Sequence, residues 1–399
     1  MKLATTQRFL PYGRQSIDDD DIRAVVDVLR GDWLTTGPMV SRLEEALTAA
    51  CGCADMVVVA NGTAALHLAL LGLGIGEGGA VVVPSVTFVA TANAARFVGA
   101  EVVFADVDPV TGLMTEATCR EAIARATLPV KAIMPVHLGG RFVELAPIRA
   151  IADEVGAVVV EDACHAIGGT DGSGRPAGAC VESHAATFSF HPVKTITSGE
   201  GGAIACGTRE LGDRLRQLRN HGLERRPGKW ADPAMGLDQG EPNPWYYEMP
   251  VIGWNYRLTD MQCALALSQL GRLKSFVDRR RALADLYDAA LKPLADTAKP
   301  IPRLAKQNGG WHLYQVAVDF AKLKRSRAAV MNALLASGVG TQVHYIPVHL
   351  QPYYRARYGR QMLRGAEAFY AGTLSLPLFP AMQKDDVQRV AESLKAALA

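Results

Sequence analysis

The chain lacks an excess of charge of either sign and lacks a long apolar run. Its 399 residues include 42 Lys and Arg against 40 Asp and Glu, a formal net charge of +2. Proteins that bind the phosphate backbone of nucleic acid carry a basic excess, so we expect no nucleic acid partner. The uncharged stretch at residues 78–95 contains proline, serine, threonine and asparagine. It is too short and too polar to span a bilayer, and we expect no membrane segment.

Features of export and of metal binding are also missing. The first 15 residues have no continuous apolar core of the kind found in signal peptides, which favours a cytoplasmic location. The seven cysteines show no C-x-x-C pair, and the nearest two, Cys51 and Cys53, are separated by a single residue. We therefore expect no metal site, and reduced, buried thiols that pack as small apolar side chains.

Short β-rich runs alternate with helix-period segments from about residue 20 to 220. The runs lie at 57–60, 80–84, 102–108, 131–138, 157–162 and 186–191. They are apolar throughout rather than alternating, as expected of strands that are covered on both faces. This pattern predicts an α/β fold with a mostly parallel central sheet.

The chain changes character after that region. Residues 223–250 are rich in proline and glycine, which disfavours both helix and central strand and predicts a long loop. Residues 259–291 have helical apolar spacing, and the rest of the chain mixes helix and strand. We therefore predict a large domain at 1–254 and a smaller C-terminal α+β domain at 255–399.

One glycine motif is misleading. Gly74, Gly76 and Gly79 match the G-x-G-x-x-G fingerprint, which binds a dinucleotide only when it follows a strand and opens a helix. Here an apolar helical segment precedes the glycines and the run 80–84 follows them. A helix C-terminal turn is the better explanation, and a dinucleotide-dependent dehydrogenase is disfavoured.

A candidate anion site follows the first β-rich run. Asn61, Gly62 and Thr63 open a helical segment, where free backbone N–H groups and the helix dipole favour a bound phosphate. Asn61 as a simple helix cap is the alternative explanation of the same residues.

Further polar residues follow two later runs. Asp162 ends the run at 157–162, Ser189 lies near the end of the next, and Lys194 follows in a loop before a glycine-rich stretch. Pyridoxal phosphate needs a lysine for its resting imine, a carboxylate to keep its pyridine nitrogen protonated, and donors for its phosphate. Lys194, Asp162 and Ser189, together with Gly62 and Thr63, match these needs. The sequence therefore predicts a pyridoxal 5'-phosphate enzyme.

Two of these residues have ordinary alternatives. Lys194 would be a surface lysine if it stood alone, but it lies between a buried strand and glycines that let the backbone approach closely. Phe88, after the run at 80–84, is placed to stack on the cofactor ring, although a core phenylalanine would give the same pattern.

Taken together, these segments resemble the DegT/StrS-type nucleotide-sugar aminotransferases, which are fold-type I pyridoxal phosphate enzymes. The resemblance covers nearly the whole chain and is carried by the segments NGTAALHLALLGLGIG, PSVTFVATANAARFVGAEVVFADVDP, VEDACHAIGG, SFHPVKTITSGEGG and GWNYRLTDMQCALALSQL. It implies an active site that is completed only in a homodimer.

The resemblance also implies a role for each matched residue. Lys194 is the Schiff-base lysine, Asp162 lies beside the pyridine nitrogen, Phe88 covers the ring, and the phosphate is held by Ser189, Gly62, Thr63 and Asn255, the last from the neighbouring subunit. Tyr12 and Tyr345 fall at substrate-side positions. His165 stands near the cofactor's 3-oxygen, where many members carry glutamine, and imidazole and amide differ in protonation behaviour. Asn255 has a simpler alternative as the cap of the helix that begins near Leu258, with Arg257 beside it.

Within the family, the segments DACHAIG, SFHPVKTIT, TQVHYIPVH and AEAFYAGTLSLPL are most similar to the branch that serves pseudaminic acid biosynthesis. That branch converts a UDP-linked 4-keto-6-deoxy-N-acetylhexosamine to the 4-amino sugar, with L-glutamate as amino donor. A dTDP- or GDP-linked substrate on the same scaffold is the alternative. Lys194 argues against the related dehydratases, in which histidine replaces the lysine, and the complete set of cofactor residues argues against a non-catalytic regulatory protein.

Overall fold

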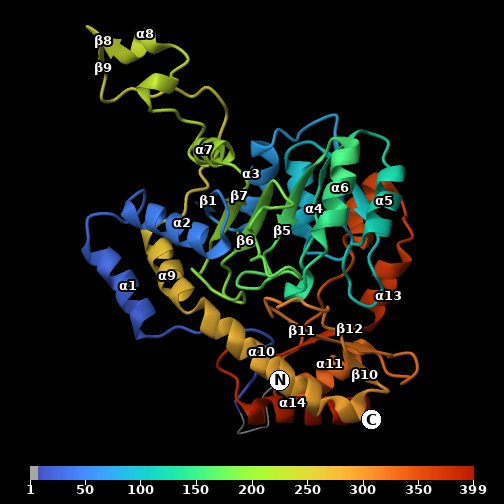
Figure 1. The fold of residues 1–399 in the computed structure, drawn as a ribbon. Helices are drawn as coiled ribbons and strands as arrows, with labels where there is room; N and C mark the ends of the chain where they lie inside the picture. The colour runs from blue at the N-terminus through green and yellow to red at the C-terminus, as the bar shows by residue number, and fades with distance from the viewer. Residues whose placement is uncertain (1–7) are drawn as a thin grey trace.

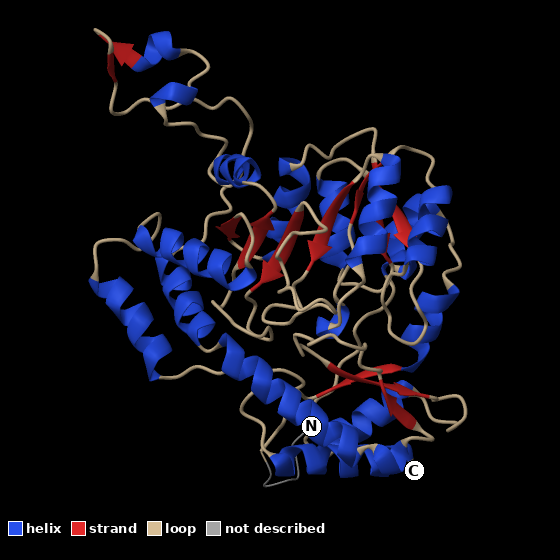
Figure 2. Cartoon of the chain, in the orientation of Figure 1, coloured by secondary structure: helices blue, strands red, loops and turns tan. Residues whose placement is uncertain are grey.

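A seven-stranded sheet forms the centre of the larger part of the molecule (Figures 1 and 2). The computed structural model describes residues 8–399, so the first seven of the 15 N-terminal residues considered above lie outside it. The strands are β1 (Asp55–Val59), β2 (Ala80–Pro84), β3 (Glu101–Ala105), β4 (Val130–Ile133), β5 (Val158–Asp162), β6 (Ala185–Ser189) and β7 (Gly202–Cys206). Their order is β1-β7-β6-β5-β4-β2-β3, and only the pairs that include β7 are antiparallel. The predicted α/β fold with a mostly parallel sheet is confirmed.

Both faces of this sheet are buried, as the uninterrupted apolar runs predict. In β1, Val57 and Val59 belong to one buried cluster, whereas Met56 and Val58 belong to another on the opposite face. Seven helices accompany the sheet: α1 (Asp19–Arg30), α2 (Pro38–Cys51), α3 (Gly62–Gly72), α4 (Val89–Phe97), α5 (Glu116–Ala124), α6 (Leu145–Val155) and α7 (Arg209–Leu218).

Strand β7 is the element that sequence analysis missed. Its sequence follows Gly199 and Gly201 and begins at Gly202, so it looked like part of a glycine-rich loop. In the structure β7 pairs with both β1 and β6 and is buried along its length. A Cβ at Gly202 would lie 2.6 Å from the carbonyl carbon of Asn61, so close backbone packing accounts for the glycine in this strand.

A second, antiparallel sheet is formed by the C-terminal part of the chain (Figure 2). Its strands are β10 (Ala298–Pro300), β11 (Tyr314–Val318) and β12 (Thr373–Leu376). The helices of this part are α9 (Asp260–Gly271), α10 (Leu273–Ala290), α11 (Arg327–Ala336), α12 (Pro352–Tyr358), α13 (Arg364–Gly372) and α14 (Lys384–Leu398). The predicted helix at 259–291 is therefore two helices that meet at Arg272. No helix within residues 8–399 is long and apolar enough to cross a bilayer.

The chain links the two sheets at more than one place. Helix α9 packs against α1 and α2, beside the large sheet, whereas α10 packs against α14. Conversely, Leu10 is fully buried in the apolar cluster around the small sheet. The other buried residues of that cluster come from the C-terminal part of the chain. The domain boundary at residues 254 and 255 stays a prediction.

Residues 223–250 form an arm that projects from the body of the molecule (Figure 1). The predicted loop contains only the short elements η2 (Pro227–Lys229), α8 (Pro233–Gly236), β8 (Leu237–Asp238) and β9 (Glu241–Pro242). Large apolar side chains on it are exposed: Met235, Trp245 and Met249.

The glycine motif and the cysteines can now be placed. Gly74, Gly76 and Gly79 lie between the end of α3 and the start of β2, so the interpretation as a helix C-terminal turn is confirmed. All seven cysteines carry free thiols. Four are buried as expected, but Cys53, Cys164 and Cys180 are partly exposed, and for these three the prediction of burial is wrong.

Candidate active site

A cavity of about 660 Å³ opens where β5 and β6 end. Asp162 is the last residue of β5 and Ser189 the last of β6, and the two strands are parallel. The C-terminal edge of a parallel sheet is where α/β proteins bind ligands. Ten residues singled out from the sequence line this cavity: Tyr12, Asn61, Gly62, Thr63, Phe88, Asp162, His165, Ser189, Lys194 and Tyr345.

The N-terminus of α3 forms one wall. The Oδ1 atom of Asn61 accepts a hydrogen bond of 2.8 Å from the Ala64 N–H, so Asn61 does cap the helix. The N–H groups of Gly62 and Thr63 precede that bond and, within residues 8–399, meet no acceptor. A Cβ at Gly62 would lie 2.9 Å from the Ser189 Cβ, so the glycine lets the helix end approach Ser189. Capping and anion binding are thus compatible here.

Asp162 is held by two donors. Its Oδ2 accepts a hydrogen bond of 2.7 Å from Thr91 Oγ1, and its Oδ1 accepts one of 3.2 Å from the Cys164 N–H. The carboxylate is only 7% exposed, and this exposed edge faces the cavity. Two such hydrogen bonds fix the direction of the carboxyl group.

Lys194 extends from the loop after β6 into the same cavity. The loop is closed by a hydrogen bond of 2.8 Å from the Lys194 N–H to the carbonyl of His191. Burial lowers the pKa of the Lys194 amine from its ordinary value, while Cys164 and Asp162 act in the opposite direction. A lowered pKa raises the share of neutral amine, the form that acts as a nucleophile or a base.

Aromatic residues line the mouth. Phe88 caps the N-terminus of α4 and its side chain is 55% exposed, so the interpretation as a core phenylalanine is wrong. Its ring centroid lies 5.9 Å from that of Tyr345. Tyr12 packs against His344 with ring centroids 5.5 Å apart. Segments from the start, middle and end of the chain therefore meet in one cavity.

Asn255 does not line this cavity among the residues of its own chain. Its side chain is exposed, and its backbone forms an isolated bridge with Asn220. Helix α9 begins at Asp260 and is capped by Thr259, which forms a capping box with Gln262. The alternative that Asn255 caps this helix is therefore wrong.

Sequence analysis missed several residues of the site. Thr91 stands three positions after Phe88 on α4, a spacing that places both on one helix face. His344 precedes Tyr345 and bonds Ser375 Oγ through Nδ1 at 2.8 Å. Both lay in segments that were quoted for other residues, and only the fold places His344 at the cavity and Thr91 behind Asp162.

The donor set fits pyridoxal phosphate. The cavity offers a partly buried amine, a fixed carboxylate, a helix N-terminus with unpaired N–H groups, and an exposed aromatic ring beside them. These correspond to the parts of the cofactor: the aldehyde, the pyridine nitrogen, the phosphate and the ring face.

Solved structures of similar architecture are sugar aminotransferases. PseC of Helicobacter pylori, described as an aminotransferase of pseudoaminic acid biosynthesis, is 27% identical, with a TM-score of 0.87 over 98% of this chain and 99% of its own. The putative sugar aminotransferase Spr1654 of Streptococcus pneumoniae, solved in a PMP form, is 28% identical, with a TM-score of 0.87 and coverage of 98% and 99%. DesI, solved in the presence of its TDP-sugar product, is 30% identical, with a TM-score of 0.85 and coverage of 100% and 94%.

The family assignment rests on the sequence as well. The profile of the DegT/DnrJ/EryC1/StrS aminotransferase family matches residues 15–395, nearly the entire chain. The chain therefore belongs to this family of pyridoxal phosphate-dependent sugar aminotransferases.

Proposed function

We propose that the protein transfers an amino group from L-glutamate to C4 of a UDP-linked 4-keto-6-deoxy-N-acetylhexosamine, as in pseudaminic acid biosynthesis. The observation that carries this proposal is the similarity to PseC, which extends over 98% of the chain at a TM-score of 0.87. A cytoplasmic location, where nucleotide sugars are made, stays a prediction.

For each part of the cofactor, the proposal names residues that line the cavity. Lys194 would hold the cofactor covalently, with Asp162 at the pyridine nitrogen and Phe88 over the ring. The N–H groups of Gly62 and Thr63, with the Ser189 hydroxyl, would hold the phosphate. The cavity that these residues share supports the assignment.

Pyridoxal phosphate, when bound, supplies an electron sink for the carbon that carries the transferred nitrogen. The protein's share is proton transfer and orientation. In each half-reaction Lys194 Nζ, with its pKa lowered by burial, would carry one proton between the cofactor and the substrate carbon that bears the transferred nitrogen, which is Cα of glutamate in the first and C4 of the sugar in the second. Asp162, fixed by Thr91, holds a negative charge at the floor of the cavity.

The sugar would lie toward Tyr12 and Tyr345, which form the outer wall of the cavity. Both phenols are neutral at physiological pH, since burial raises the pKa of each from its ordinary value. Neutral phenols donate and accept hydrogen bonds with sugar hydroxyls without adding charge.

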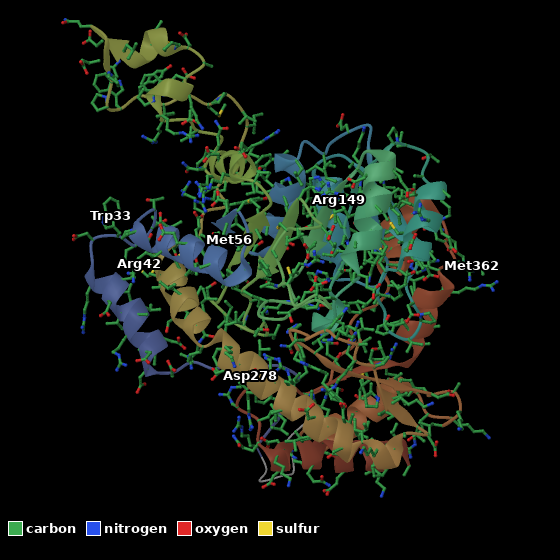
Figure 3. All side chains as sticks on the ribbon, in the orientation of Figure 1. Trp33, Arg42, Met56, Arg149, Asp278 and Met362 are labelled. Atoms are coloured by element: carbon green, nitrogen blue, oxygen red, sulfur yellow. The ribbon has the colours of Figure 1, made fainter. Side chains whose placement is uncertain are left out.

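The working unit would be a homodimer with shared active sites. Asn255 is exposed, outside the cavity of its own chain, and free of any capping duty, which supports a role in the partner's site. A second observation is the exposed apolar surface near the turn between α1 and α2, where Trp33 lies at the edge of the molecule (Figure 3). Exposed apolar side chains gathered at one place are typical of protein interfaces.

A TDP-linked keto sugar is the second candidate substrate. It is supported by DesI, which is 30% identical to this chain and was solved with its TDP-sugar product. The two candidates share the reaction and differ in the nucleotide and the sugar.

A substrate panel tests the proposal. The purified protein is incubated with L-glutamate and UDP-, dTDP- or GDP-linked 4-keto sugars, and the products are identified by mass spectrometry. We expect the 4-amino product from the UDP-linked N-acetylhexosamine, and none from the Lys194→Ala variant. Amination of a dTDP-linked sugar alone would replace the first candidate by the second.

A further inference from the structure

His165 makes two hydrogen bonds that together define its protonation state. Its Nδ1 accepts a hydrogen bond of 3.2 Å from the backbone N–H of Gly139. Its Nε2 lies 3.2 Å from the hydroxyl oxygen of Tyr345. A backbone N–H can only donate a hydrogen bond, so the Nδ1 atom that accepts it carries no hydrogen. The hydrogen of the neutral ring must therefore be on Nε2.

The backbone conformation at Gly139 fixes the hydrogen bond from its N–H to His165 Nδ1. Gly139 lies in the short helix η1 (Leu138–Gly140) with φ 68°, a left-handed conformation that favours glycine. A Cβ at Gly139 would lie 3.0 Å from Gln315 Oε1 and 3.2 Å from Arg141 Nη1. Another residue at this position would be strained by the positive φ and would press on both side chains, and the Gly139 N–H is held toward His165.

We propose that His165 is a neutral, single-tautomer positioning residue: Gly139 holds its Nδ1 as an acceptor, and its Nε2–H donates to Tyr345, whose own hydroxyl hydrogen is thereby directed into the cavity. The proposal rests on the aminotransferase function and assigns Tyr345 a donor role in it. In hydrogen-bonding terms the imidazole then equals a glutamine amide, with one acceptor and one donor at its two ends.

The surroundings of the ring disfavour a charged form. His165 is only 6% exposed, and Lys194 and Arg141 act on it as positive neighbours. Burial, followed by these neighbours, holds the pKa of His165 well below its ordinary value. His312 lies against the ring with centroids 4.3 Å apart, and its own Nδ1 has no hydrogen-bond partner among the residues that the structure describes. In the charged form of His165, the Nδ1–H would point at the N–H of Gly139, so that two hydrogen-bond donors would face each other.

The tautomer is measured directly by ¹⁵N NMR of the histidine-labelled full-length protein, with and without cofactor. Protonated and bare ring nitrogens resonate in separate ranges, and His165→Gln identifies the His165 signals by their loss. We expect a bare Nδ1 and a protonated Nε2 that persist as the pH falls through about 6.5, the ordinary histidine pKa. His137 serves as an internal reference, since its Nδ1 accepts from the Val143 N–H and its Nε2 bonds Glu161.

Turnover supplies the second measurement. The first half-reaction, amino transfer from glutamate, is followed by cofactor absorbance and needs no sugar, so an error in the sugar assignment does not affect it. We expect His165→Phe to slow this half-reaction about tenfold, the scale of one lost hydrogen bond in the site. His165→Gln should recover most of that loss, and His312→Phe should change the rate by less than about threefold.

The coupling to Tyr345 completes the test. If His165 acts through Tyr345, the double variant His165→Phe, Tyr345→Phe should be no slower than Tyr345→Phe alone. Independent, multiplying effects would overturn the proposal. So would a protonated Nδ1 in the spectrum, or a His165→Gln variant that is folded but as slow as His165→Phe.

Discussion

Thr91 Oγ1 donates a hydrogen bond of 2.7 Å to Oδ2 of Asp162, although the two residues lie 71 positions apart in the chain. The hydroxyl of Thr87 lies 2.7 Å from Thr91 Oγ1 and continues the chain of hydrogen bonds. This pair fixes the direction of the carboxylate, and it ties helix α4 to the end of strand β5 at the floor of the cavity.

We expect Asp162→Asn to keep the fold and most cofactor binding while slowing turnover by ~10²–10⁴-fold, the range for lost acid–base assistance. Thr91→Val should give a smaller loss, about tenfold, because the carboxylate remains but loses one donor. Thr87→Val is the matched control, since its hydroxyl contacts Thr91 and not Asp162. Steady-state kinetics on folded variants measure these changes in turnover. Near-normal turnover of Asp162→Asn would show that Asp162 has only a structural role.

Reduction with borohydride should attach the cofactor permanently to Lys194. Burial lowers the pKa of this amine, which favours its reaction with the aldehyde. Peptide mapping by mass spectrometry locates the adduct. Lys229 on the arm, which is paired with Asp213 of α7, is the comparison lysine and should carry no adduct. The Lys194→Ala variant should bind cofactor reversibly and lose turnover. An adduct on any other lysine would contradict the assignment.

If the active site is shared, as we propose, two inactive variants should complement each other. Mixing Lys194→Ala protein with Asn255→Ala protein forms heterodimers in which one site keeps both wild-type groups. Activity should recover toward about one quarter of the wild-type value, because random exchange makes half of the dimers mixed and each carries one intact site. Subunit exchange is verified with tagged chains. Exchange without recovered activity would place Asn255 outside the partner's site.

Three buried histidines predict a loss of stability in mild acid. Burial lowers the pKa of His344 to about 3 and holds the pKa of His165 and His312 well below the ordinary value. Below about pH 6.5 the unfolded chain therefore binds protons that the folded chain does not, so the free energy of unfolding falls by up to about 1.4 kcal/mol per pH unit for each such histidine.

Urea unfolding between about pH 7.5 and 5.5, above the range where carboxylates titrate, measures this slope. His344→Gln should make the slope shallower, because it removes one of the three histidines. A slope that is identical in His344→Gln and in the wild type would contradict the prediction.

A buried network next to the cavity predicts a stability effect. Glu161 accepts hydrogen bonds of 2.8 Å from His137 Nε2 and 2.5 Å from Ser183 Oγ, and all three side chains are buried. Glu161→Ala leaves both donors without a partner and should lower the free energy of unfolding by about 3–5 kcal/mol. Glu182→Ala, which removes a partly exposed pair with Arg175, should cost about 1 kcal/mol or less. Equal effects of the two substitutions would argue against the network.

The sequence by itself determined the chemistry and most of the architecture. Strands that are buried on both faces must be apolar at every position, so the six predicted runs mark six of the seven strands of the large sheet. The family resemblance, the aminotransferase activity and the cofactor are confirmed by the family profile and the solved relatives. Asp162 was visible because it ends a strand and Lys194 because it follows one, at the edge where a parallel sheet presents its ligands.

Tertiary structure decided what depends on contacts between distant segments. Strand β7 was hidden because its glycine is required by the backbone of Asn61, which no local pattern records. The donor that holds Asp162 comes from Thr91, and the tautomer of His165 is set by the N–H of Gly139. Thr259, and not Asn255, caps helix α9, which the sequence alone did not reveal. Local sequence specifies which groups are available and how the backbone bends, whereas the hydrogen-bond partner of a buried group is fixed only when the folded chain brings the two together.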